Sequence, residues 1–242
     1  MGQRQDDLKR ARQRLKGFLL SHDVRYAGRA DWGPAHRRWL STFAFDSAWQ
    51  QLAFEEHRRT IEDRLAQCER LETALREAAV DWRFYPAVLC LQAMRGVQFT
   101  TAVGLLAELG DLSRFAQPRQ LMAWLGVTPC EHSSGEKRRQ GSITKNGNSY
   151  ARKLLVEAAW SYQHPARVSP EIQRRHEGIP KPIVDRAWDA QVRLCGRYRK
   201  LVARGKPKNI AVVALARELS GFIWDISRLA MSLAARPEVR MA

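Results

Sequence analysis

The chain has 242 residues, of which 45% are hydrophobic and 27% charged, so its composition is that of a globular protein and excludes a disordered one. Lys and Arg number 41 against 25 Asp and Glu, a net charge of +16, which predicts a polyanionic partner, most simply nucleic acid. A merely solubilising basic surface is the alternative, but the excess is clustered. Arg114 to Lys153 holds 8 basic and 2 acidic residues, and Arg193 to Lys208 holds 7 basic and none acidic. This clustering favours nucleic acid.

The cysteines and the apolar runs exclude several other classes. Cys68, Cys90, Cys130 and Cys195 are scattered without a CxxC pair, so neither a zinc site nor a disulfide framework is predicted. Cys68 and Cys90 lie in apolar helical patterns and are predicted to be buried thiols. The N-terminus lacks the apolar core of a signal peptide, and no run of about eighteen apolar residues could span a membrane. A cytoplasmic protein without membrane contact is expected.

The first third of the chain predicts two helices. Residues 4–20 place apolar residues at helical spacing, and the following loop is anchored by Trp32, Trp39 and Leu40 as core. Residues 46–80 predict one long helix with a heptad seam, whose members are Phe54, Ile61, Cys68, Leu71, Leu75 and Ala78. Such a seam packs against another helix of the same chain or against a partner subunit.

Residues 86–94 and 100–109 predict two apolar helices joined by a turn at residues 95–98. This is the pattern of a helix-hairpin-helix, in which the turn at Gly96 and Val97 would bind a phosphate through its backbone. Gln98 stands where such hairpins usually have a second glycine, and an ordinary αα-hairpin is the alternative.

Further helices are predicted at residues 118–125, 150–163, 183–203 and 209–234, with an irregular segment at 164–182. Trp160 is predicted to be core rather than a platform for stacked bases. No alternation typical of a strand is present, so the predicted fold is all-α, with a helix-hairpin-helix-like unit preceded by a long coiled-coil-like helix.

The segment from residue 129 to residue 153 has the residue types of a phosphate-binding loop. Ser133 and Ser134 precede a glycine, and positive charge follows at Lys137, Arg138, Arg139, Lys145 and Arg152. A serine can attack a phosphodiester directly when cations neutralise the charge that develops. On spacing alone, an ordinary surface loop is the commoner explanation. Asp111, Glu131, Glu157 and Asp185 are isolated carboxylates, so no two-metal site is predicted.

Residues 95–160 also resemble a known family. Its pattern is carried by the run Ala107 to Asp111, by Ser133-Ser134-Gly135, and by a string that continues through Gly141, Ile143-Thr144-Lys145, Gly147-Asn148, Arg152 and Glu157. This is similar to the C-terminal domain of insertion-sequence transposases of the 110/116/902 type, and the similarity extends over most of the chain.

The resemblance implies a two-part protein. In this family an N-terminal RuvC-like domain holds Mg²⁺ with an acidic set, and the C-terminal domain carries a serine nucleophile, here Ser134 with Ser133 as runner-up. A structured guide RNA bridges the DNA molecules in such systems. By this comparison, Gly96, Val97, Lys137, Arg138, Arg139, Lys145, Asn148 and Arg152 would contact DNA.

The expected organisation follows from the same resemblance. Residues 1–45 would be a linker helix and loop after a missing RuvC-like domain, residues 46–82 a long helix that joins subunits, and residues 83–242 the serine domain. No cofactor is expected in this chain, and Mg²⁺ only with the missing domain. The alternatives are a catalytically inactive fragment that binds DNA or RNA, and a remnant without a retained role.

Overall fold

The computed structural model describes residues 2–131 and 140–235. The chain divides into two compact units, Met1–Ala78 and Ala79–Ala242. The first holds α1 (Gly2–Ser21), α2 (Pro34–Thr42) and nearly all of α3 (Ala48–Ala79). The elements of the second are α4 (Tyr85–Leu91), α5 (Phe99–Leu109), η1 (Leu112–Arg114), α6 (Pro118–Trp124), β1 (Pro129–Glu131), β2 (Gln140–Ile143), α7 (Ser149–Ala159), η2 (Trp160–Gln163), α8 (Pro170–His176), α9 (Lys181–Ala203) and α10 (Lys208–Ala234). The predicted all-α fold is confirmed.

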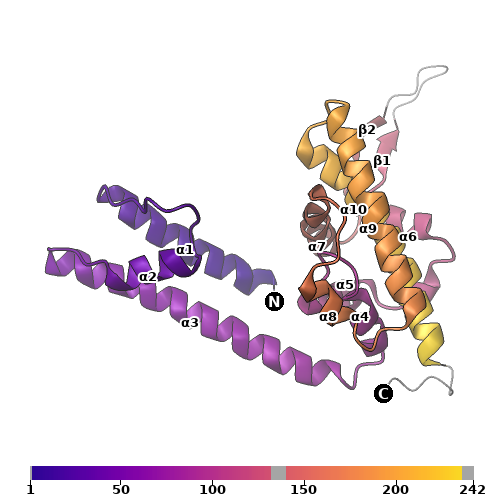
Figure 1. Cartoon of the computed structure of the whole chain (residues 1–242), viewed down its shortest axis with the longest axis horizontal. Helices are drawn as coiled ribbons and strands as arrows, with labels where there is room; N and C mark the ends of the chain where they lie inside the picture. Colours follow the sequence, from indigo (N-terminus) through magenta and orange to yellow (C-terminus); the bar gives the residue numbers. More distant parts are fainter. Residues whose placement is uncertain (1, 132–139, 236–242) are drawn as a thin grey trace. The chain divides into compact units, whose positions relative to one another are not determined.

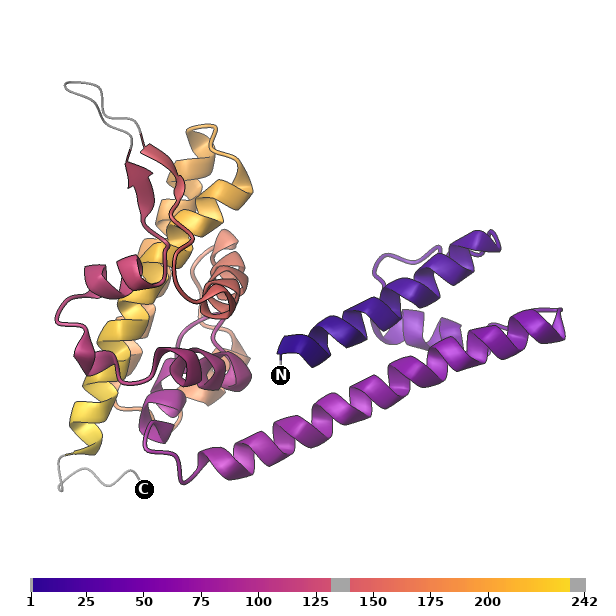
Figure 2. The ribbon, with the colours of Figure 1, turned by 180° about the vertical axis from the view of Figure 1, so that it is seen from behind.

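The first unit is built on two long helices that run in opposite directions, α1 and α3 (Figures 1 and 2). Their spacing of apolar residues, three or four apart, turns one stripe of each helix toward the other. The buried cluster between them consists of Ala11, Leu15, Leu19, Leu40, Phe54 and Ile61. The short α2 contributes Leu40 and begins with Pro34, whose fixed φ suits the first helical position.

The heptad seam of α3 is covered over only part of its length. Phe54 and Ile61 are buried in the first unit's own core, whereas Leu71 and Leu75 are half-buried and Ala78 is exposed. Cys68 is also half-buried, so its predicted burial is wrong, while Cys90 is buried as predicted. The reason is that the buried cluster that covers the seam ends at Ile61, one heptad before Cys68.

His36 is a buried polar residue of the first unit, 5% exposed. Its Nδ1 accepts a hydrogen bond from the backbone N–H of Trp32 at 3.0 Å, so its proton sits on Nε2. Burial is the main cause that lowers the pKa of His36, and nearby Lys16 lowers it further against the opposing effect of Asp31.

This lowered pKa predicts a loss of stability in acid. In the unfolded chain the pKa of His36 has its ordinary value of about 6.5, and in the folded chain the pKa is lower. Below about pH 6.5 the unfolded chain therefore binds a proton more readily than the folded chain does, and the free energy of unfolding falls. Denaturant titrations at pH 7.5 and 5.5 measure the fall. His36→Asn, which keeps an acceptor for Trp32 but does not titrate, is expected to reduce it; an unchanged fall in this variant would place its origin elsewhere.

The second unit is organised around α10, which packs against α4, α6, α7 and α9 (Figure 1). Because these neighbours surround it, α10 is apolar on more than one face; its buried residues include Ala211, Leu215, Leu219, Ile223 and Ile226. Trp224 of α10 donates its indole N–H to the carbonyl oxygen of Phe115 at 2.9 Å. This bond fixes the segment between η1 and α6 against the central helix.

Three predictions about the second unit need correction. A short antiparallel pair, β1 and β2, was not predicted; its register joins Pro129 to Ile143 and Glu131 to Gln140. The segment predicted as irregular contains α8, which Ser169 caps by accepting from the N–H of Ile172. Trp160, predicted as core, is 37% exposed. Strands of three or four residues are too short for alternation to show, and α8 has only two turns.

Candidate functional site: a hairpin held on a fixed frame

The two strands bracket the predicted serine loop. Paired residues Glu131 and Gln140 are the ends of β1 and β2, and the chain between them is residues 132–139. Ser133, Ser134, Lys137, Arg138 and Arg139 all lie outside the described residues. The described residues at this place are the two paired strands that precede and follow residues 132–139.

The residues that follow β2 are docked on the turn between α6 and β1. Lys145 donates its backbone N–H to the carbonyl oxygen of Gly126 at 3.0 Å, and Thr144 donates to Thr128 at 2.9 Å. Gly126 and Gly147 both adopt positive φ, 65° and 81°. A side chain on Gly147 would collide with the carbonyl oxygen of Trp124. The glycine is needed here because two backbone segments touch.

Arg152 of α7 binds this frame through its guanidinium. Its Nη1 lies 3.1 Å from the carbonyl oxygen of Leu125, 2.8 Å from that of Asn146 and 3.1 Å from that of Gly147. Arg152 was predicted to contact DNA phosphates. In the structure it joins the two segments that the glycines bring together, which gives it a positioning role in the frame.

Asn148 has a structural role at the start of α7. Its side-chain oxygen accepts from the N–H of Ala151 at 2.9 Å, which caps the helix, and its side-chain amide donates to Glu108 of α5. Lys145 is exposed at a φ of 59°. Of the predicted contact residues after β2, Lys145 is therefore the one whose side chain is presented to solvent.

The turn at Gly96 and Val97 packs against the rest of the second unit. Gly96 has a φ of 78°, and a side chain there would meet the carbonyl oxygen of Ala158 and the hydroxyl of Ser161. Val97 is buried; its N–H donates to Met94 and its carbonyl oxygen accepts from Arg175 Nη1 at 3.0 Å. Burial is the main cause that lowers the pKa of Arg175. The role of this turn in phosphate binding stays a prediction.

The contacts of Arg175 were not foreseen from the sequence, nor were those of its neighbour. His176 contacts the carbonyl oxygen of Ala93 at 3.1 Å, and Arg95 donates to that of Pro165 at 2.8 Å. The turn after α4 is thus tied to α8 and to the segment before it. The Ser-Pro-Glu start of α8 was the available signal, because serine before proline is typical of a helix cap.

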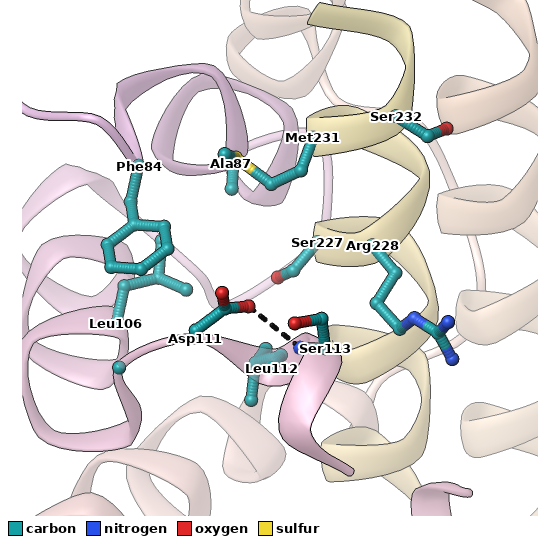
Figure 3. A pocket seen from close by; sticks show the side chains of 11 residues that line it. Phe84, Ala87, Leu106, Asp111, Leu112, Ser113, Ser227, Arg228, Met231 and Ser232 are labelled. Atoms are coloured by element: carbon teal, nitrogen blue, oxygen red, sulfur yellow. Dashed lines mark hydrogen bonds between the residues drawn. The ribbon is translucent and has the colours of Figure 1, made fainter. Parts of the chain in front are cut away.

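A separate cavity of about 300 Å³ lies between α10, α4, α5 and η1 (Figure 3). Asp111 accepts from the N–H of Ser113 at 2.8 Å, and this bond, helped by Arg83 and Arg114, lowers the pKa of Asp111. Ser227 is buried, its hydroxyl points into the cavity, and it has no hydrogen-bond partner within the described part of the chain. The walls are otherwise mainly apolar.

The described residues contain neither a group of side chains suited to a metal ion nor a helix suited to cross a membrane. Across residues 2–131 and 140–235, no three His, Cys, Asp or Glu side chains gather as a metal-binding group. None of the helices described is both long and apolar enough to cross a membrane. Asp111, Glu157 and Asp185, three of the isolated carboxylates identified in the sequence, form no such group among the described residues.

The second unit is mainly helical and carries one short antiparallel strand pair, and the region that matches a known family lies within this unit. Residues 89–177, from α4 through α8, match the model described as Transposase IS116/IS110/IS902 family. The matched region therefore belongs to this family of transposases.

Two relatives that align over most of the chain agree with this assignment. The chain is 40% identical over 223 residues to a putative transposase, y4qE, of Sinorhizobium fredii. The aligned region covers 92% of this chain and 54% of the relative. The chain is 27% identical over 202 residues to the transposase for insertion sequence element IS1533 of Leptospira borgpetersenii, 83% of this chain and 58% of that protein. The chain thus spans a little over half the length of these two relatives.

Proposed function

We propose that the chain is the DNA-binding part of an insertion-sequence transposase and that Ser134 is its nucleophile, with Ser133 as the alternative. The observation that carries the proposal is the hairpin base. Residues 132–139, which contain both serines and three cations, join the paired ends of β1 and β2. The glycines and Arg152 fix that base on the helical unit, and a fixed base is what a nucleophile on a loop needs for reproducible positioning.

The proposed step is an attack of the Ser134 hydroxyl oxygen on a DNA phosphorus. The bond between Oγ and phosphorus forms, the bond from phosphorus to one sugar oxygen breaks, and the serine proton is passed on to the departing sugar hydroxyl. Lys137, Arg138, Arg139 and Lys145 would neutralise the charge on the phosphoryl oxygens. The Mg²⁺ expected from the resemblance would act in a RuvC-like domain and not on the residues described.

A second basic surface supports DNA binding. The turn between α9 and α10 and the adjoining helix ends carry five exposed cations: Arg199, Lys200, Arg204, Lys206 and Lys208. Arg193 and Arg197 of the same cluster instead pair with Glu218 of α10, at 3.1 and 2.8 Å. The turn lies at the same end of the second unit as the β-hairpin (Figures 1 and 2). One DNA backbone could therefore run from the hairpin to this turn.

Partners of the complete protein belong to the same proposal. Pairing of DNA molecules would need a second subunit, and the half-buried residues Cys68, Leu71 and Leu75 of α3 are the part of the heptad seam available for it. A structured guide RNA would share the basic surfaces with DNA. The protein would act in the cytoplasm, where its DNA substrate is found.

Covalent capture tests the nucleophile. The chain is combined with the part of the Sinorhizobium fredii relative that it does not cover, and with a nicked suicide DNA substrate that traps the intermediate. We expect a denaturation-resistant protein–DNA species, reduced at least about 1,000-fold by Ser134→Ala, since loss of a nucleophile has effects of this size or larger. The yield is measured on a denaturing gel.

Two matched serine variants interpret the result. Ser133→Ala and Ser142→Ala, the latter in β2 outside the loop, are expected to keep the covalent species. A reversed result, with Ser133→Ala inactive and Ser134→Ala active, would move the nucleophile to Ser133. If both Ser134→Ala and Ser133→Ala form the species, the assignment of Ser134 as the nucleophile is wrong. If the wild-type chain forms no covalent species while DNA is still bound, the chain is a binding module.

A further inference from the structure

The first unit contains a cavity of about 210 Å³ between α1, the following loop and α2. Four of its lining residues carry aromatic rings: Tyr26, Trp32, His36 and Trp39. The cavity lies far in sequence from the serine loop and uses none of the residues proposed above. It is smaller than the roughly 300–1,000 Å³ of sites for drug-sized ligands, which suits a single flat ring system.

The rings are held in place by one another. The His36 ring stacks on Trp39 with centroids 5.5 Å apart and an interplanar angle of 24°, and it meets Tyr26 and Trp32 edge-on at 4.7 and 5.0 Å. The bond from the Trp32 N–H to His36 holds Trp32 at a φ of 67°. His36 is buried, whereas Tyr26, Trp32 and Trp39 are half-buried. Ring surface of these three therefore remains open toward the cavity.

The surroundings of the cavity are cationic. Lys16 and Arg25 line it, and the guanidinium of Arg12 lies 5.1 Å from the centroid of the Trp32 ring. Burial and, after it, the charge of Arg37 lower the pKa of Arg12. The carboxylate of Asp31 is paired with Lys16 at 2.6 Å. The ligand should consequently be aromatic and bear a negative charge.

We propose that this aromatic pocket, lined by Tyr26, Trp32, His36 and Trp39, receives one unpaired nucleobase of a DNA or RNA strand. Arg25, which is exposed and lines the cavity beside the Lys16–Asp31 pair, would hold the phosphate next to that base. Stacking of bases on aromatic side chains beside a positive groove is how single strands are bound without sequence preference. A cationic ligand, the usual alternative for an aromatic cage, is disfavoured because Arg12 already occupies a ring face and the rim repels positive charge.

The proposal rests on the proposed function only in taking nucleic acid as the partner. It is tested with the whole chain and fluorescein-labelled oligomers of deoxythymidine, of uridine and of abasic deoxyribose phosphate, all of one length. We expect the abasic oligomer to bind about 5- to 150-fold more weakly than oligodeoxythymidine, because it has the same backbone charge but no base to stack. Whether thymidine or uridine binds more tightly identifies the strand.

Protein variants provide the second arm. Trp32→Leu, which keeps apolar volume but removes the ring, is expected to weaken oligodeoxythymidine binding about 5- to 150-fold and abasic binding hardly at all. Trp32→Phe should restore most of the loss. Trp49→Leu is the matched control in the same unit, since Trp49 is 82% exposed and does not line the cavity.

The outcomes separate the two proposals. If wild-type protein binds the abasic oligomer as tightly as oligodeoxythymidine, or if Trp32→Leu and Trp49→Leu behave alike, the pocket does not take a base. The abasic comparison needs no variant, so a folding defect in Trp32→Leu cannot obscure it. Failure of the Ser134 proposal, by contrast, appears as a covalent species that persists in Ser134→Ala, or as no covalent species with the wild-type chain, while base-dependent binding stays intact.

Discussion

Gly147→Ala is expected to lower the free energy of unfolding of the second unit by about 2–5 kcal/mol. A left-handed backbone costs a residue with a side chain about 1–2 kcal/mol, and overpacking against fixed neighbours adds about 1–3 kcal/mol. Both apply here, because Gly147 has a φ of 81° and its missing side chain would collide with the carbonyl oxygen of Trp124. That oxygen belongs to backbone and cannot turn away. Denaturant titration followed by circular dichroism measures the change.

Gly178→Ala is the matched control for this prediction. Gly178 has a similar φ of 74°, in the turn after α8, but a side chain there would meet nothing within 4 Å. Its replacement should therefore cost only the backbone part, about 1–2 kcal/mol. Equal losses in the two variants would mean that the approach of residue 147 to Trp124 does not limit stability, and the frame beneath the serine hairpin would then be less rigid than its contacts indicate.

The long elements of this fold were predictable because their apolar periodicity is repeated many times. Residues 46–80 predicted α3, which spans Ala48–Ala79, and residues 209–234 predicted α10, which spans Lys208–Ala234. In a helix of that length, the spacing that places apolar residues on one face recurs over several turns. The strands of three and four residues contain none, and their pairing depends on contacts between residues separated by the whole loop.

The site was predictable by residue type but not by role. Clustered cations in the sequence indicated phosphate binding, yet a sequence does not reveal which cations meet carbonyl oxygens within the chain. Arg152 meets the carbonyl of Leu125, 27 residues earlier, and Arg175 meets that of Val97, 78 residues earlier. Trp32 and Trp39 were predicted as core; both pack against the buried cluster, and both are only half-buried and also line a cavity. Long-range partners decide such roles.

Arg152→Met is expected to lower the free energy of unfolding by about 1.5–3 kcal/mol while leaving the salt dependence of DNA binding unchanged. A hydrogen bond to a charged group contributes about that much, and here one Nη1 lies within bonding distance of three carbonyl oxygens. Methionine keeps the apolar stem and removes the donors. Denaturant titration gives the stability, and binding to one duplex at several salt concentrations gives the slope.

Lys145→Met is the matched variant, since it removes one cation seven residues earlier on the same frame. Lys145 is exposed and its frame contact is through the backbone N–H, which methionine retains. Stability should change by less than about 0.5 kcal/mol, as for most surface substitutions. The slope of log K against log salt should fall by about 1, as expected when a phosphate contact is lost.

The two variants together decide between a cation that binds DNA and a cation that holds the loop. If Arg152→Met reduces the salt slope by about 1 and leaves stability intact, Arg152 contacts a phosphate, as its place in the sequence first suggested, and the carbonyl contacts are dispensable. If Arg152→Met lowers the free energy of unfolding and leaves the salt slope unchanged, Arg152 positions the hairpin. The charge that contacts DNA then comes from Lys145 and the residues of the loop. A positioning arginine also predicts that Arg152→Met reduces the covalent yield at saturating DNA, because the nucleophile is then poorly held although DNA is bound.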